Sequence, residues 1–188
     1  MNLQHPRPDL GPSGIVRGHL PCLVELEQFG GRGVVDLFGL KNGGRALAAS
    51  DEHYGSMHNL NLPGRGVNMG DGWETARRRG PGNDWVVVAL GKPGVVDRVE
   101  VDTAYFKGNY PDQCSLQAAS IPGGSIEAIA AQSLYWENLM PKQHLQADRL
   151  HHFDEQINSD LGAVSHVRFC IYPDGGVARL RLWGTVQL

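Results

Sequence analysis

The chain is poor in cysteine and lysine, and it has no long apolar run and no strong charge of either sign. Its 188 residues include only Cys22, Cys114 and Cys170, without the Cys-x-x-Cys spacing of a zinc site, so neither such a site nor a disulfide framework is expected. No apolar stretch approaches the ~20 residues that cross a bilayer, and the first residues lack the apolar segment of a secretory signal. The formal net charge of −3 gives no general attraction to nucleic acid or to anionic membranes. We therefore expect reduced thiols, a cytoplasmic location, and neither nucleic acid nor membrane as a partner.

Glycine and proline are abundant instead. The 25 glycines and 11 prolines make up nearly a fifth of the chain, a turn-rich composition that argues against a helix bundle. Residues 1–30 contain four prolines, and we interpret them as an N-terminal linker or tail. Residues 31–188 contain short apolar runs separated by glycines, which predicts a single all-β domain.

Two strands are predicted in the middle of the domain. Residues 85–90 are apolar on both faces, which indicates a central strand, and the glycines of residues 91–94 are expected to end it. Residues 95–102 alternate between valines and charged side chains, the pattern of a half-buried strand. A further strand is predicted at residues 114–121.

Two apolar segments near the C-terminus flank a turn sequence. Residues 164–172 and 178–183 both alternate, and the Pro-Asp-Gly-Gly of residues 173–176 joins them, so the pattern predicts a β-hairpin. Residues 125–140 fit either a helix capped by Ser125 or a long covering loop. The whole pattern predicts an antiparallel β-sandwich with long loops at one edge or end.

The densest group of polar side chains comes just before the central strand. Asp71 and Glu74 are candidates for proton transfer, and Arg77 or Arg78 could hold an anion. In the alternative interpretation, Trp73 fills the end of the sandwich and the charges form a solvated turn.

A second polar group follows the alternating strand. Asp102, Thr103, Lys107 and Asn109 supply a carboxylate, a hydroxyl, an ammonium and an amide near one strand end. The Lys-Gly-Asn sequence could also serve only to reverse the chain.

A third polar group has the composition of a metal site without its motif. Asp51, Glu52, His53 and His58 could in principle ligate a metal. No second motif supports this, so no cofactor is firmly predicted, and a divalent metal stays an open alternative.

These segments, taken together, resemble the allantoicase family. The residues that carry the resemblance are Ala49-Ser-Asp51 with Tyr54-Gly55 and Asn59-Leu60, Gly70-Asp-Gly-Trp-Glu-Thr75 with the arginines behind it, Asn83-Asp-Trp85, Val101-Asp-Thr103 with Phe106-Lys-Gly-Asn109, and Tyr172-Pro-Asp-Gly-Gly176 running into Arg179-Leu-Arg-Leu-Trp-Gly184. They cover roughly residues 33–184 in the family's order. The resemblance implies a galactose-binding-like jelly roll and the hydrolysis of allantoate to ureidoglycolate and urea, a step in purine breakdown.

The chain departs from the family in one respect. Family members usually carry two such domains in tandem, whereas this chain has one, which is most similar to the second. The resemblance therefore implies a homo-oligomer or a second allantoicase domain as partner. Two alternatives stay open: a half-enzyme that needs a second copy of the domain, and a non-catalytic module that binds carbohydrate or another small ligand.

The expected chemistry assigns roles to the two main polar groups. Release of urea from allantoate needs an anion clamp, a general acid and a general base, roles that suit arginine and carboxylic side chains. The predicted catalytic residues are Asp71, Glu74 and Asp102, and the predicted substrate-binding residues are Arg77, Arg78, Lys107 and Asn109. In an enzyme these carboxylates and arginines should meet in one cleft, whereas in a scaffold they should pair with each other.

Overall fold

The computed structural model describes residues 33–187, and its fold is organised around one long strand, β4 (Asp84–Asp102). The first half of β4 pairs with β8 (Val164–Tyr172) and β2 (Arg45–Ala49), whereas its second half pairs with β10 (Arg179–Val186) and β7 (Leu150–Phe153). The same strand therefore belongs to both layers of a sandwich. All of these pairings are antiparallel.

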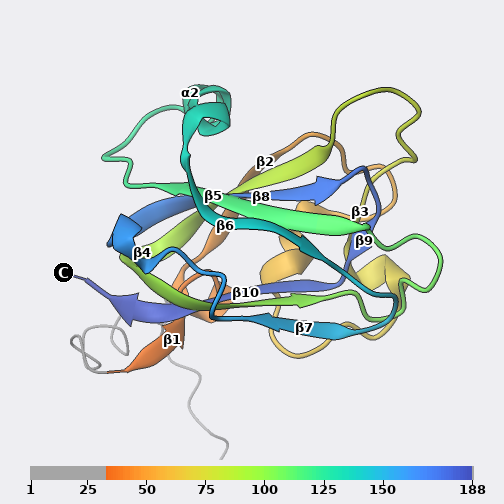
Figure 1. The fold of residues 1–188 in the computed structure, drawn as a ribbon, viewed down its shortest axis with the longest axis horizontal. Helices are drawn as coiled ribbons and strands as arrows, with labels where there is room; N and C mark the ends of the chain where they lie inside the picture. The colour runs from red at the N-terminus through yellow and green to blue at the C-terminus, as the bar shows by residue number, and fades with distance from the viewer. Residues whose placement is uncertain (1–32, 188) are drawn as a thin grey trace, which may run out of the picture.

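The two layers contain nearly all the strands (Figure 1). The first layer consists of β2, the first half of β4, β8, β5 (Gln113–Ala119) and β6 (Glu137–His144); the second consists of β1 (Val34–Asp36), β10, the second half of β4, and β7. A separate ribbon pairs β3 (Trp73–Glu74) with β9 (Gly176–Val177). The helices are the short α2 (Ile126–Gln132) and the 3-10 turns η1 (Leu40–Asn42), η2 (Met57–Asn61), η3 (Met69–Asp71), η4 (Ser133–Tyr135) and η5 (Ser159–Leu161). The predicted all-β antiparallel sandwich is confirmed.

The predicted break at residues 91–94 is wrong. The chain does not reverse there but continues as β4, with only a shift in its pairing to β8 between Ala89 and Gly94. Gly91 is required for a close approach instead of a turn, because a Cβ atom on it would lie 1.7 Å from the carbonyl oxygen of Asn42.

The predicted C-terminal hairpin is also wrong, although both of its strands exist. β8 pairs with β4 and β5, and β10 pairs with β1 and β4, so the two strands are not partners of one another. Residues 173–178 carry the chain from the first layer to the second, and β9 binds β3 on the way. The chain does turn at residues 173–176, as predicted, but the turn sequence does not determine in which layer the next strand lies.

The ambiguous segment at residues 125–140 contains both a helix and a strand. The Ser125 hydroxyl accepts a hydrogen bond from the Ala128 N–H at 3.3 Å and caps α2, as the sequence indicates. Ile129 is the buried side chain of this helix, and β6 then follows as an unpredicted strand.

The core lies between the apolar faces of the two layers. Val99 and Val101 are fully buried, as the alternation of residues 95–102 predicts, and so are Phe169 in β8 and Leu182 in β10. Cys114 is part of this core, and burial raises the pKa of its thiol to about 12.

The predicted tail, residues 1–30 with Cys22, lies outside the described residues. Within residues 33–187, no helix is long and apolar enough to cross a membrane.

Candidate functional site

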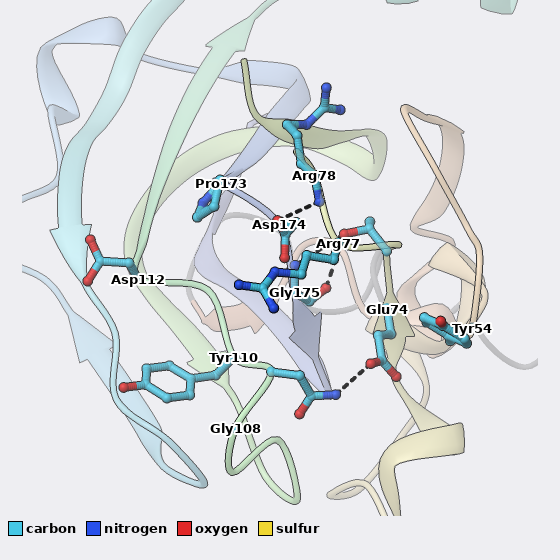
Figure 2. A pocket seen from close by; sticks show the side chains of 12 residues that line it. Tyr54, Glu74, Arg77, Arg78, Gly108, Tyr110, Asp112, Pro173, Asp174 and Gly175 are labelled. Carbon is cyan, nitrogen blue, oxygen red and sulfur yellow. Dashed lines mark hydrogen bonds between the residues drawn. The ribbon is translucent and has the colours of Figure 1, made fainter. Parts of the chain in front are cut away.

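Three chain segments that are distant in sequence meet at one end of the sandwich. They are the segment that follows β3, the segment that leads into β5, and the turn between β8 and β9 (Figure 2). Together they enclose a hollow of about 600 Å³. Its lining consists of Tyr54, Glu74, Thr75, Arg77, Arg78, Gly108, Asn109, Tyr110, Asp112, Pro173, Asp174 and Gly175.

Gly175 holds the three segments together. Its N–H donates to the Thr75 hydroxyl at 3.1 Å, its carbonyl accepts from the Thr75 N–H, and the next residue, Gly176, donates to the Asn109 carbonyl at 2.8 Å. A Cβ atom on Gly175 would lie 2.7 Å from the Asn109 carbonyl oxygen, and its φ of 136° is one that side chains rarely adopt. Only glycine fits this position.

Trp73 and Phe106 support the hollow from the core. The Trp73 side chain is fully buried, and its indole N–H donates to the Asp51 carbonyl at 2.9 Å. Phe106 is also buried, so close to Gly72 and Gly176 that neither could carry a Cβ atom. Because side chains alternate along β3, Trp73 fills the sandwich end, as the alternative interpretation expected, while the next residue lines the hollow.

That next residue, Glu74, joins the two polar groups that the sequence singled out. Its carboxylate accepts a hydrogen bond from the side-chain amide of Asn109. Figure 2 shows this contact at the lower edge of the hollow. The structure therefore brings Glu74 and Asn109 together, although they are 35 positions apart.

The two predicted anion-binding arginines differ in their partners. Arg77 is exposed, and within residues 33–187 no carboxylate forms an ion pair with it. Figure 2 shows its guanidinium group extending across the hollow. The Arg78 guanidinium instead pairs with the buried Asp84, and the Arg78 backbone N–H donates to the Asp174 carboxylate at 2.8 Å. Arg77 is thus available to a ligand, whereas Arg78 connects parts of the fold.

Three of the predicted site residues do not line this hollow. Asp71 pairs with Arg179 at 2.8 Å, and Asp102 pairs with Arg65 at 2.9 Å. Lys107 is exposed outside the lining. Asp71 and Asp102 each form an ion pair with an arginine of the fold instead of meeting Glu74 in this hollow, so their predicted catalytic role stays a prediction.

The sequence reasoning missed several residues that line the hollow. Tyr110 and Asp112 belong to no motif, and Tyr54 belongs only to the family resemblance, without a predicted role. Asp174 belongs to the predicted turn sequence and to the family resemblance, but no site role is predicted for it. In the sequence, Asp174 is an aspartate followed by two glycines, and an ordinary turn has the same composition.

The acidic members of the candidate metal set have structural partners. The Asp51 carboxylate accepts from the Ala76 N–H at 2.6 Å, and Glu52 accepts from the Met57 N–H at 2.7 Å. In the described part of the chain, no group of three or more histidine, cysteine, aspartate or glutamate side chains is arranged to hold a metal ion.

Comparison with known proteins gives consistent results in sequence and in structure. The family model described as "Allantoicase repeat" matches residues 35–187. A probable allantoicase of Photobacterium profundum is 60% identical over 161 residues, which are 86% of this chain and 48% of that protein. A probable allantoicase of Stutzerimonas stutzeri is 62% identical over 152 residues, 81% of this chain and 46% of that protein.

Among solved structures, the allantoicase of Saccharomyces cerevisiae superposes with a TM-score of 0.69 at 39% identity, covering 80% of this chain and 43% of that one. A family 32 carbohydrate-binding module of Streptococcus pneumoniae EndoD superposes with a TM-score of 0.55 at 10% identity, covering 80% of this chain and 99% of the module, which shows the shared fold alone. These neighbours confirm the predicted jelly-roll sandwich. The chain spans about half the length of the curated relatives it matches, and it belongs to the allantoicase repeat family.

Proposed function

We propose that this chain takes part in the hydrolysis of allantoate to ureidoglycolate and urea, and that the substrate binds in the hollow beside Glu74 and Arg77. One observation carries the proposal. A hollow of about 600 Å³ contains both the guanidinium group of Arg77 and the hydrogen-bonded side chains of Glu74 and Asn109. This volume is within the range of small-molecule sites, roughly 300–1,000 Å³. Membership of the allantoicase repeat family supports allantoate as the substrate.

The chemistry of allantoate suits these side chains. Allantoate is a carboxylate whose α-carbon bears two ureido groups. Arg77 can bind the carboxylate through two parallel N–H donors. Glu74 is the proton-transfer group, and Asn109 holds its carboxylate in place, with the amide oxygen of Asn109 available to a ureido N–H.

The other predicted residues take different roles in this proposal. Arg78 fixes the position of Asp174 through its backbone N–H. Asp71 and Asp102 stabilise the fold through their arginine partners and do not contact substrate. No role is assigned to Lys107.

The chain is proposed to act with a second repeat. Because the curated relatives are about twice as long, that repeat would be either another copy of this chain or a second allantoicase domain. We also propose a cytoplasmic location, which is consistent with the buried free thiols of Cys114 and Cys170.

The direct test is urea release by the purified chain incubated with allantoate, with and without a chelator, together with the mass of the protein in solution. Replacing Arg77 by Ala should lower kcat/KM by roughly 10–150-fold, the equivalent of the ~1.5–3 kcal/mol of hydrogen bonds to a charged group. Arg79→Ala is the matched control, since Arg79 is exposed and outside the lining. Retained urea release in Arg77→Ala would contradict the proposed clamp. Binding of a sugar without any urea release would favour the non-catalytic module.

A further inference from the structure

The proposed reaction needs a second proton-transfer group besides Glu74. One group must give a proton to the departing urea nitrogen, and another must take a proton from the attacking water. The hollow is lined by three carboxylates, those of Glu74, Asp112 and Asp174. The second group is therefore sought between the last two.

Asp112 lies at the open edge of the hollow. Its side chain is 70% exposed, and its nearest charged partner is the equally exposed His144, at 3.6 Å. Figure 2 shows its carboxylate on the side away from Glu74 and pointing out of the hollow. A carboxylate so placed is free to move in solvent and is poorly fixed for proton transfer.

Asp174 is held much more firmly. One of its carboxylate oxygens, Oδ2, accepts the Arg78 N–H at 2.8 Å, and the next residue, Gly175, is bound to Thr75 on both its N–H and its carbonyl. The other carboxylate oxygen forms no hydrogen bond within residues 33–187. Asp174, Arg77 and Glu74 line the same hollow (Figure 2).

We propose that Asp174 is a catalytic residue, the general base that takes a proton from the attacking water, while Glu74 is the general acid. The assignment rests on the proposed hydrolysis of allantoate at this hollow. It fits the geometry because a substrate whose carboxylate is bound by Arg77 would present its α-carbon between two fixed carboxyl groups. The free oxygen of Asp174 is the atom that receives the proton.

The step balances with water as the only co-reactant. A water O–H bond breaks, its proton goes to the Asp174 carboxylate, and the oxygen electron pair forms the new bond to the α-carbon. The bond from that carbon to one ureido nitrogen breaks with its electron pair on nitrogen, which takes the proton of the Glu74 carboxyl group and leaves as urea. Glu74 is then a carboxylate and Asp174 a carboxylic acid, and exchange with solvent restores both.

The test compares two lining carboxylates in the full chain. Asp174→Asn keeps an oxygen that can accept the Arg78 N–H but cannot take a proton, and Asp112→Asn is the matched control. We expect kcat for urea release to fall ~10²–10⁴-fold in Asp174→Asn, with KM, calorimetric allantoate binding and Tm close to those of the parent protein, while Asp112→Asn keeps most of its turnover. Asp174→Ala should lose as much and regain part of its activity with added formate, a small carboxylate that can enter the vacated space.

A merely structural role for Asp174 would give a different pattern. Asp174→Asn with the turnover of Asp112→Asn would overturn the assignment, as would parallel losses of Tm, allantoate binding and activity without formate rescue. If the parent protein releases no urea from allantoate, either alone or together with a second allantoicase domain, the proposed function fails and the role of Asp174 fails with it. If the parent protein is active and Asp174→Asn is equally active, only the inference fails.

Discussion

The hollow and the face of the second layer that points away from the core both contain arginines and carboxylates. We call that face, which carries Arg179 and Asp102, the outer face; it differs from the hollow in how its charges are paired. On the outer face, Arg179 pairs with Asp71 and Arg65 pairs with Asp102. In the hollow, Arg77 has no ion-pair partner within the described residues, although carboxylates line the same space. Composition therefore does not separate site from scaffold here; the pairing of the charges does.

Burial explains the difference between the two regions. Arg179 and Asp102 are each about 4% exposed, and a charge taken so far out of water needs a partner. Arg77 keeps contact with water, so its charge needs no internal partner, and a ligand can replace that water. The exposed Arg77 at the sandwich end can therefore stay without an ion-pair partner, whereas the buried Arg179 on the outer face cannot.

The largest effect is expected from Glu74→Gln. The glutamine oxygen can still accept the Asn109 amide hydrogen bond, so stability should change little, but the side chain can no longer transfer a proton. We expect kcat for urea release to fall ~10²–10⁴-fold. The exposed Glu155, replaced by Gln, serves as control. Undiminished turnover in a folded Glu74→Gln protein would contradict a catalytic role for Glu74.

The next effect concerns the outer face and is one of stability. Replacing Arg179 by Met leaves Asp71 without its cation, and loss of one partner of a buried pair costs about 3–5 kcal/mol. Asp71 retains some exposure, so we expect the lower end of that range in a urea unfolding experiment. Arg98→Met removes the exposed, longer pair with Glu100 and should cost less than about 1 kcal/mol. Equal costs for the two variants would contradict the distinction between buried and exposed pairs.

Local patterns in the sequence predicted β4, β5, β8 and β10 but not β1, β2, β6 or β7, and they did not predict which strands pair. The alternation at Val99 and Val101 depends only on neighbouring residues, so the buried face of β4 was predicted correctly. The hairpin failed because Pro173–Gly176 specifies a change of direction over four residues, whereas the choice of layer depends on contacts with β1, β4 and β5.

The same limit explains which site residues were found. Glu74 and Arg77 were singled out because they lie close together in sequence. The ion pair of Asp71 could not be predicted, because its partner, Arg179, lies 108 positions away and no local pattern reveals it. Asp174 was missed for the converse reason, since its local sequence has a sufficient explanation as a turn.

A smaller effect is expected from Gly175→Ala, and it should be seen both in stability and in urea release. A side chain at this φ is strained, a cost of roughly 1–3 kcal/mol, and its Cβ atom must displace the Asn109 backbone. Both the Tm and urea release should fall. Gly123→Ala is the matched control, because Gly123 also has a positive φ but has open space around it. Loss of Tm without loss of urea release would show that the hollow tolerates movement of Asn109.

The smallest effect is a pH dependence of stability in the second layer, at His151 of β7. Its Nδ1 contacts the Val101 carbonyl at 3.0 Å, and its Nε2 accepts the Gln146 N–H at 2.8 Å, so the neutral ring is the form that fits. Burial lowers the pKa of His151 below its ordinary value of about 6.5. The unfolded chain therefore binds this proton more readily than the folded protein, and stability should decrease as pH falls through the window below 6.5.

Burial also lowers the pKa of His166, which acts in the same direction, so the parent protein alone cannot isolate His151. The difference in Tm between pH 7 and pH 5 should be smaller in His151→Asn than in the parent protein. The exposed His58, replaced by Asn, should leave that difference unchanged. If the pH dependence is identical in all three proteins, the folded protein binds a proton at His151 as readily as the unfolded chain does. The contrast between the paired charges of the second layer and the open hollow would then not extend to β7.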